Sequence, residues 1–132
     1  MPVSNPTAFA FNRSRHTSLA ERVTIANTHW SRLVGLMGKD SASFVPGDAL
    51  WIVPCRGVHT LGMRFPIDVV YLDKDKFVVH VEENLRPWRV APVRMRAASV
   101  LELPAHTLSS TRTVIGDQLE IGVGEIARMA RA

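Results

Sequence analysis

Apolar and polar residues alternate with a period of two along much of the chain, a pattern that predicts half-buried β-strands. The alternation is visible at Phe9 and Phe11 and again over residues 20–26. Further strands are expected over residues 49–53, 58–63, 67–72, 77–81, 98–103 and 118–121. Because a charged turn at residues 73–75 joins two of these runs, residues 67–81 are predicted to form a hairpin.

One segment has helical periodicity instead. The residues at helical spacing are Trp30, Leu33, Val34 and Met37. Thr28 precedes them as a candidate N-cap, and Gly38 follows them as a residue that stops a helix. We therefore predict a helix over about 28–38 whose apolar face packs against the sheet. Shorter helices are expected at residues 106–113 and in the tail over 125–131.

The predicted strands follow one another with little helix between them after residue 40, which favours antiparallel pairing. We therefore predict an α+β domain of mainly antiparallel β-structure. Its compact sheet is expected to curl, or to form a small barrel-like shape, because such shapes protect the sheet edges. At 132 residues, the whole of 1–132 fits a single domain. Residues 1–7 are expected to be a loose N-terminal arm and residues 122–132 a C-terminal tail.

The amino-acid composition excludes several classes of protein. A hydrophobic share of 46% indicates a globular chain, and no apolar run approaches the roughly 20 residues of a membrane helix. The N-terminal segment lacks the apolar centre of a secretion signal, so we expect a cytoplasmic location and no membrane partner. The single cysteine, Cys55, excludes a disulfide framework and an all-cysteine zinc site. We expect no bound metal and no cofactor.

Basic residues are in excess, with a net charge of +4, and thirteen of the sixteen cations are arginine. Arginine forms forked hydrogen bonds with carboxylates and phosphates, although a GC-rich genome produces the same bias. Within the long loop predicted over 82–96, the cations are Arg86, Arg89, Arg94 and Arg96. Together with Trp88 they are suited to an anionic ligand or to nucleic acid. The favoured interpretation of this segment by itself is a solvated loop in which Trp88 is pinned to the core.

Candidate chemistry is densest between Cys55 and Asp68. Cys55, His59 and Asp68 could form a small catalytic group with a thiolate nucleophile. Cys55, His59 and Met63 could instead hold a soft ion such as Cu(I). In the third and favoured interpretation, Cys55 and Met63 fill the core while His59 bonds a backbone carbonyl. Asp68 lies in an apolar strand and needs a partner, for which Arg64 is predicted.

Several blocks of sequence, in order along the chain, resemble one known family. They are RLVGLMG at residues 32–38, HTLGMRFPIDVVYLD at 59–73, ASVLELP at 98–104 and the Gly-Asp pair at 116–117. The first three resemble that family's motifs R-x-x-G-L-M, H-T-x-x-M-R-F-P-I-D-V-x-F-x-D and V-L-E-L-P-A-G. Over about residues 17–121 the chain is therefore similar to domain-of-unknown-function family 192. The resemblance implies a small, mainly β domain and carries with it no established activity, cofactor or catalytic residue.

These observations predict a non-catalytic binding domain for a small or peptidic, anionic ligand. The predicted ligand-binding residues are His59, Thr60, Arg64, Trp88, Arg89 and Arg94. A small enzyme using Cys55, His59 and Asp68 is the alternative, and the residues leave open whether any reaction is catalysed. A basic protein that associates with nucleic acid through residues 86–96 is the third hypothesis.

Overall fold

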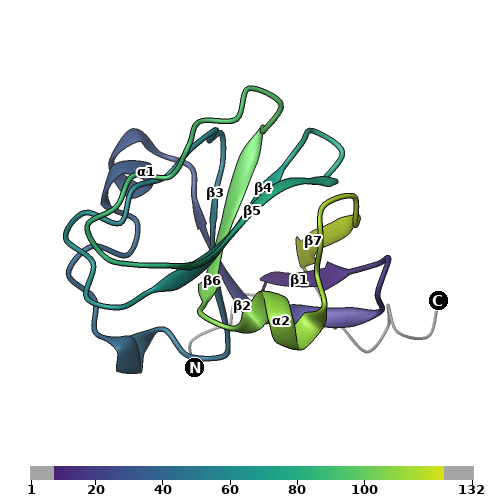
Figure 1. The fold of residues 1–132 in the computed structure, drawn as a ribbon, viewed down its shortest axis with the longest axis horizontal. Coiled ribbons are helices and arrows are strands. Elements are labelled where there is room, and N and C mark those ends of the chain that lie inside the picture. Colours follow the sequence, from purple (N-terminus) through teal and green to yellow (C-terminus); the bar gives the residue numbers. More distant parts are fainter. Residues whose placement is uncertain (1–7, 124–132) are drawn as a thin grey trace, which may run out of the picture.

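A computed structural model describes residues 8–123 and shows one curled sheet of seven strands (Figure 1). The strands are β1 (Ala8–Asn12), β2 (Thr17–Ala26), β3 (Gly47–Ile52), β4 (Ile67–Leu72), β5 (Val78–Leu85), β6 (Ser99–Pro104) and β7 (Leu119–Val123). The predicted arm over 1–7 and the predicted tail helix over 125–131 lie outside the described residues. The strand order is β5-β4-β6-β3-β2-β1-β7, with β2 and β3 parallel and the other neighbours antiparallel. The α+β prediction of a mainly antiparallel, curled sheet is therefore confirmed.

The two outermost strands of the sheet, β5 and β7, approach each other at one end. Phe77 and Gln118 form an isolated antiparallel bridge there. The backbone N–H of Val78 donates to the carbonyl of Asp117 at 2.8 Å, and that of Leu119 donates to Lys76 at 2.9 Å. The sheet is consequently a half-barrel in which part of each edge is paired, which limits edge-to-edge association.

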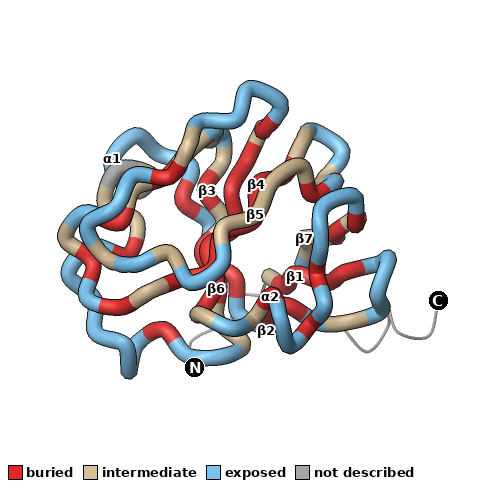
Figure 2. Tube along the Cα trace, in the orientation of Figure 1, coloured by how far each residue is buried: buried red, intermediate tan, exposed pale blue. Residues whose placement is uncertain are grey.

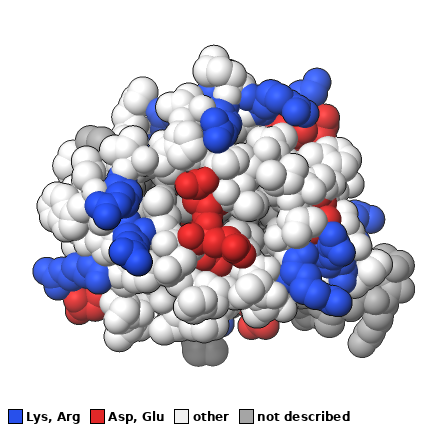
Figure 3. Space-filling model, in the orientation of Figure 1, with Lys and Arg blue, Asp and Glu red and all other residues white. Residues whose placement is uncertain are grey.

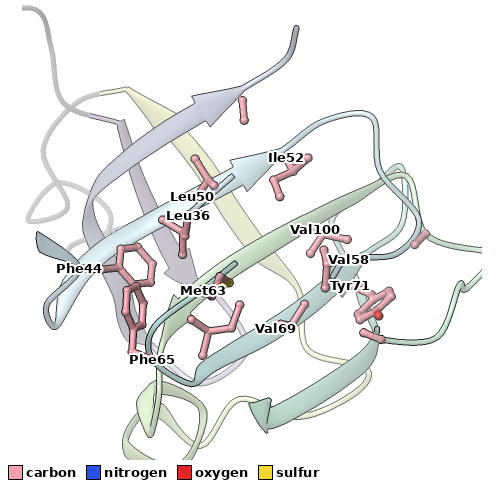
Figure 4. Packing of buried hydrophobic residues seen from close by; sticks show 14 residues of the cluster. Leu36, Phe44, Leu50, Ile52, Val58, Met63, Phe65, Val69, Tyr71 and Val100 are labelled. Atoms are coloured by element: carbon pink, nitrogen blue, oxygen red, sulfur yellow. The ribbon is translucent and has the colours of Figure 1, made fainter. Parts of the chain in front are cut away.

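Side chains alternate across the central strands and form a core on each face of the sheet. The α1-side core includes Leu36, Phe44, Leu50, Ile52, Val58, Met63, Phe65, Ile67, Val69, Tyr71 and Val100. The core inside the curl includes Leu19, Val23, Val70, Leu72, Val78, Leu101, Leu103, Leu108 and Leu119. Every residue of β4 and β6 is buried, as Figure 2 shows in red. In the α1-side core the rings of Phe44 and Phe65 lie 5.9 Å apart (Figure 4).

Helix α1 (His29–Val34) begins where the sequence predicts and ends earlier. Thr28 caps it, because its side-chain oxygen accepts a hydrogen bond from the N–H of Ser31. The helix stops at Gly35, whose φ of +49° turns the chain, and not at Gly38. This turn buries Leu36 and leaves Trp30 73% exposed. The prediction that the Trp30 face packs against the sheet is therefore wrong for this residue, and the side chain of Leu33 lies outside the described part.

The predicted strand over 58–63 is absent, and a turn replaces it. The N–H of Met63 donates to the carbonyl of Thr60, and Gly62 between them has a φ of +76°, which a strand does not accommodate. A short α2 (Thr107–Thr111) confirms the helix expected after residue 106, and a 3-10 turn spans Ser41–Ser43. Among residues 8–123, neither helix has the length and apolar character that crossing a bilayer requires.

A candidate binding pocket beside helix α1

A small cavity of about 50 Å³ lies between α1, β3, β6 and the segment that follows β3. The apolar residues of its wall include Leu36, Ile52, Val58 and Met63, which Figure 4 shows within the α1-side core. Four polar or ionisable side chains also line it, and they are Arg32, Cys55, His59 and Glu102. Residues from three separated parts of the sequence, 32–37, 52–63 and Glu102, thus converge on one cavity.

Glu102 brings a carboxyl group into the apolar interior. Its strand β6 pairs with β3 through Leu50 and with β4 through Val69, so Glu102 lies at the centre of the sheet. The side chain is 3% exposed, and its Oε2 atom has no hydrogen-bond partner in the described part of the chain. Burial raises the pKa of Glu102 to about 8, because a charge is costly where water is excluded. The group is therefore mostly a neutral carboxylic acid at pH 7.

His59 and Cys55, from the segment that follows β3, add two further polar side chains to the lining. The Nδ1 atom of His59 is buried and, like Glu102 Oε2, has no partner among the described residues. The Cys55 thiol donates to the carbonyl of Gly57 at 2.9 Å. Burial raises the pKa of this thiol, and the carboxyl of Glu102 adds to that shift. The sulfur is thus held as a thiol, the form that is a poor nucleophile.

Arg32 supplies the positive charge of the pocket from the last turn of α1. Its Nη1 donates to the carbonyl of Pro54 at 3.0 Å, and its Nε donates to that of Thr28 at 3.3 Å. The Nη2 atom lies 3.1 Å from Nδ1 of His29. Within residues 8–123, no carboxylate lies within ion-pair distance of Arg32. The guanidinium is oriented by backbone carbonyls and keeps its charge uncompensated.

Asp68 does not join Cys55 and His59, because it points to the opposite face of the sheet. Its Oδ1 accepts from the N–H of Asn84, and its Oδ2 accepts from the N–H of Leu108, both at 2.9 Å. Leu108 belongs to the core inside the curl. Asp68 therefore ties the end of β5 and the start of α2 to β4, and the buried carboxyl that shares a pocket with Cys55 and His59 is Glu102.

The predicted pair of Arg64 with Asp68 is also wrong. Arg64 is exposed and its Nη1 bonds Asp40 Oδ1 at 2.9 Å. The reason is the turn over 60–63 and the following Pro66, which carry Arg64 to the surface while Asp68 enters the buried strand β4.

Thr60 holds a turn and does not line the pocket. Its hydroxyl donates to the carbonyl of Arg86 at 2.6 Å and accepts from the N–H of Arg89 at 2.9 Å. Arg89 and Arg94 are exposed on the loop that follows. Trp88 is 66% exposed, so the prediction that it is pinned to the core is wrong. Of the six predicted ligand-binding residues, His59 alone lines the cavity described here.

The three residues of the soft-metal hypothesis, Cys55, His59 and Met63, line this cavity together, as that hypothesis requires. Met63 is 4% exposed and Cys55 packs against the same core, which matches the interpretation of these two residues as core-filling.

Sequence reasoning missed Glu102 and Arg32, although both left a signal. Glu102 interrupts the apolar run of the 98–103 strand, and a carboxylate at a buried position needs a partner or a changed charge state. Arg32 occurs inside the helical segment that carries the first family motif. Neither signal indicates that the two residues meet, since 70 positions separate them.

Three comparisons relate the chain to known proteins. The model of the DUF192 family, described as an uncharacterized ACR, matches residues 10–121. A UPF0127 protein from Pyrococcus abyssi is 32% identical over 115 residues, which cover 83% of this chain and 93% of that protein. A crystallised protein of unknown function from Novosphingobium aromaticivorans has a TM-score of 0.73 at 18% identity, covering 86% of this chain and 82% of the other. A crystallised Sinorhizobium meliloti protein, named as a candidate transcription regulator, has a TM-score of 0.72 at 22% identity, with 91% and 98% covered. The sequence resemblance is confirmed, and the two structures share the fold.

Proposed function

The chain belongs to the DUF192 family, and we propose that this member binds a small molecule whose carboxylate or phosphate end enters the pocket beside α1. One observation carries the proposal: two buried polar atoms, Glu102 Oε2 and His59 Nδ1, have no partner among residues 8–123, and both residues line the same cavity. Buried polar atoms in native proteins nearly always have a hydrogen-bond partner. A bound polar group would supply the partners that the described chain does not.

The charge of the pocket favours an anion. Arg32 is positive and unpaired with any carboxylate in the described part, while Glu102 is mostly neutral below pH 8 because burial raises its pKa. The guanidinium can donate to a ligand oxygen, and so can the protonated carboxyl of Glu102. A cavity of about 50 Å³ has room for an end group of a few atoms, so the rest of the ligand would lie outside it.

The thiol chemistry supports binding over catalysis. The pKa of Cys55 is raised by burial, and its hydrogen is already donated to Gly57. A nucleophilic cysteine needs the opposite environment, one that lowers the thiol pKa. Asp68, the third member of the predicted catalytic group, is also unavailable to Cys55, because both of its carboxyl oxygens accept backbone N–H groups.

The test uses sodium acetate and inorganic phosphate as probes at pH 6.5, with sodium chloride at matched ionic strength as the reference. Thermal unfolding is measured for the wild type, for Arg32→Gln, and for Arg13→Gln as a control that removes an exposed arginine paired with Glu120. We expect a probe at tenfold excess over its dissociation constant to stabilise the wild type and Arg13→Gln by about 1.4 kcal/mol. Arg32→Gln should bind at least tenfold more weakly. An equal response of all three proteins, or none, contradicts the proposal.

A second measurement addresses the carboxyl group. Probe affinity should fall as pH rises through about 8, because an ionised Glu102 repels an anion. Glu102→Gln keeps a hydrogen-bond donor and removes the titration, so its affinity should stay level over the same range. A wild-type affinity that does not change between pH 7 and 9 would remove Glu102 from the binding site.

A further inference from the structure

A second surface, separate from the pocket, combines exposed apolar and basic side chains on residues 86–96. The exposed apolar members are Trp88 (66% exposed), Val90 (73%), Val93 (63%) and Met95 (73%). The exposed basic members are Arg86, Arg89, Arg94 and Arg96. We refer to these eight residues as the Arg–Trp strip. Large apolar side chains concentrated in this way on a surface mark an interaction site more often than isolated ones do.

The backbone beneath the strip is anchored to the rest of the fold by hydrogen bonds. The N–H of Ala91 donates to the carbonyl of Val58 at 2.9 Å, and that of Arg94 donates to Arg56 at 2.8 Å. From the core, the hydroxyl of Tyr71 donates to the carbonyl of Pro92 at 2.8 Å.

Trp88 itself has a φ of +63°, a left-handed conformation that is costly for a residue with a large side chain. The clamp by Thr60 on Arg86 and Arg89 holds it in place. The strained turn lowers the stability of the fold and exposes a tryptophan. Such a combination is typical of an interaction site.

The charge of the strip calls for an anionic partner. Within residues 8–123, none of its four arginines lies within 4.0 Å of a carboxylate oxygen. On the face shown in Figure 3, basic groups surround a central acidic group. The strip directly follows the acidic pair Glu82 and Glu83 of β5, of which Glu82 is bonded to His80. An anionic partner would therefore contact the strip and avoid β5.

The apolar members of the strip indicate which class of anionic partner it suits. Val90, Val93 and Met95 offer no flat face on which a nucleic-acid base could stack, and the strip has one aromatic ring. Aliphatic side chains can instead enter the boundary between lipid headgroups and acyl chains, where tryptophan is also favoured. We propose that the Arg–Trp strip docks on the surface of an anionic lipid bilayer. Its arginines contact lipid phosphates, and Trp88, Val90, Val93 and Met95 lie at the depth of the headgroups. The proposal does not depend on the pocket, and it replaces the expectation that no membrane takes part.

The test is co-sedimentation of the full chain with vesicles of phosphatidylcholine, either pure or containing 30% phosphatidylglycerol. We expect the anionic vesicles to bind at least tenfold more tightly, with the difference shrinking as salt rises from 0.05 to 0.5 M. Arg89→Gln with Arg94→Gln should weaken this binding roughly 25-fold, about a factor of five for each arginine. The matched control, Arg13→Gln with Arg112→Gln, makes the same change in net charge away from the strip and should change the affinity less than threefold.

The apolar contribution is tested with Trp88→Ser and, as its control, Trp30→Ser, which removes an equally exposed tryptophan from α1. Brominated lipids should quench the tryptophan fluorescence of the wild type and of Trp30→Ser, and this quenching should be absent in Trp88→Ser. Far-ultraviolet circular dichroism verifies that every variant is folded.

Three results would overturn the proposal. The first is equal binding to neutral and anionic vesicles, and the second is equal weakening by the strip variants and their controls. The third is tight binding of a single-stranded oligonucleotide at 0.15 M salt without vesicle binding, which would assign the strip to nucleic acid. Because Arg32→Gln leaves the strip intact, it should bind vesicles like the wild type even if the pocket proposal fails.

Discussion

Two buried carboxyl groups on neighbouring strands of the same sheet have opposite environments. Asp68 on β4 is 1% exposed, and both of its oxygens accept backbone N–H groups. Glu102 on β6 is 3% exposed, and its Oε2 atom has no partner in the described part of the chain. Residue 68 faces the core inside the curl and residue 102 faces the α1-side core.

The difference separates a structural carboxylate from one that is available to a ligand. Two N–H donors compensate the burial of Asp68, so the group can join three elements. The Oε2 atom of Glu102 has no partner among residues 8–123, and the pKa of about 8 reflects a burial that disfavours the charged form. A buried polar group that the fold leaves without a partner lowers stability, and such sites are enriched where proteins bind or react.

The largest expected effect on the free energy of unfolding comes from replacing Asp68. Asp68→Ala leaves the N–H groups of Asn84 and Leu108 without their acceptor and should lower the free energy of unfolding by about 3–5 kcal/mol. Asp68→Asn keeps one acceptor oxygen and should cost less, about 1–3 kcal/mol. Urea denaturation at pH 7 measures both. A loss below 1 kcal/mol in the alanine variant would mean that Asp68 has no anchoring role.

The second prediction concerns the pH dependence of stability that Glu102 causes. Its pKa is about 8 in the folded protein against an ordinary value of 4.5, so between these pH values the folded chain keeps a proton that the unfolded chain has released. Raising the pH over this range should therefore reduce the stability of the wild type by up to about 1.4 kcal/mol per pH unit from this group. Glu102→Gln should remove this contribution to the slope.

Glu102→Leu extends the same test. Replacing a buried ionisable group with an apolar residue of similar size should stabilise the protein at pH 8 by about 1–4 kcal/mol, and by less at pH 5. Thermal or urea unfolding at both pH values gives the comparison. A leucine variant that is less stable than the wild type at pH 8 would show that Glu102 has a stabilising partner.

The smallest effect tests the partner that the sequence suggested for Asp68. Arg64→Gln breaks only the exposed pair with Asp40, so it should change the free energy of unfolding by less than about 0.5 kcal/mol. Combined with Asp68→Asn, it should give the sum of the two single changes, because the two side chains do not interact. A deviation from additivity above 1 kcal/mol would mean that Arg64 and Asp68 are coupled.

A local element could be predicted from the sequence where a single local rule determines it. Strand β4 occupies the predicted residues 67–72, and it pairs with β5 in the predicted hairpin across the turn at 73–75. Thr28 caps α1 because an N-cap needs only a side-chain oxygen and the N–H groups of the next turn. The requirement that Asp68 be hydrogen-bonded also follows from its apolar neighbours, although its partners do not.

The candidate site was harder to predict from the sequence, because its residues meet only in the tertiary structure. Helix α1 ends at Gly35 and not at Gly38, and the residue after this turn, Leu36, is buried and lines the pocket together with Arg32 of the helix. The exposure of Trp88 likewise depends on Thr60, which fixes the loop from 28 positions away in the sequence.

The sequence by itself determined the strand periodicity, the helix start, the family and the excess of arginine, because each depends on residue type and local spacing. The tertiary structure alone decided that Asp68 and Glu102 face different cores, and that Glu102, His59 and Arg32 share one cavity. The physical reason is that the period-two pattern records only that a strand has two faces. When both faces are buried, as in β4 and β6, hydrophobicity no longer distinguishes them, and the packed neighbours determine whether a buried carboxyl finds a partner.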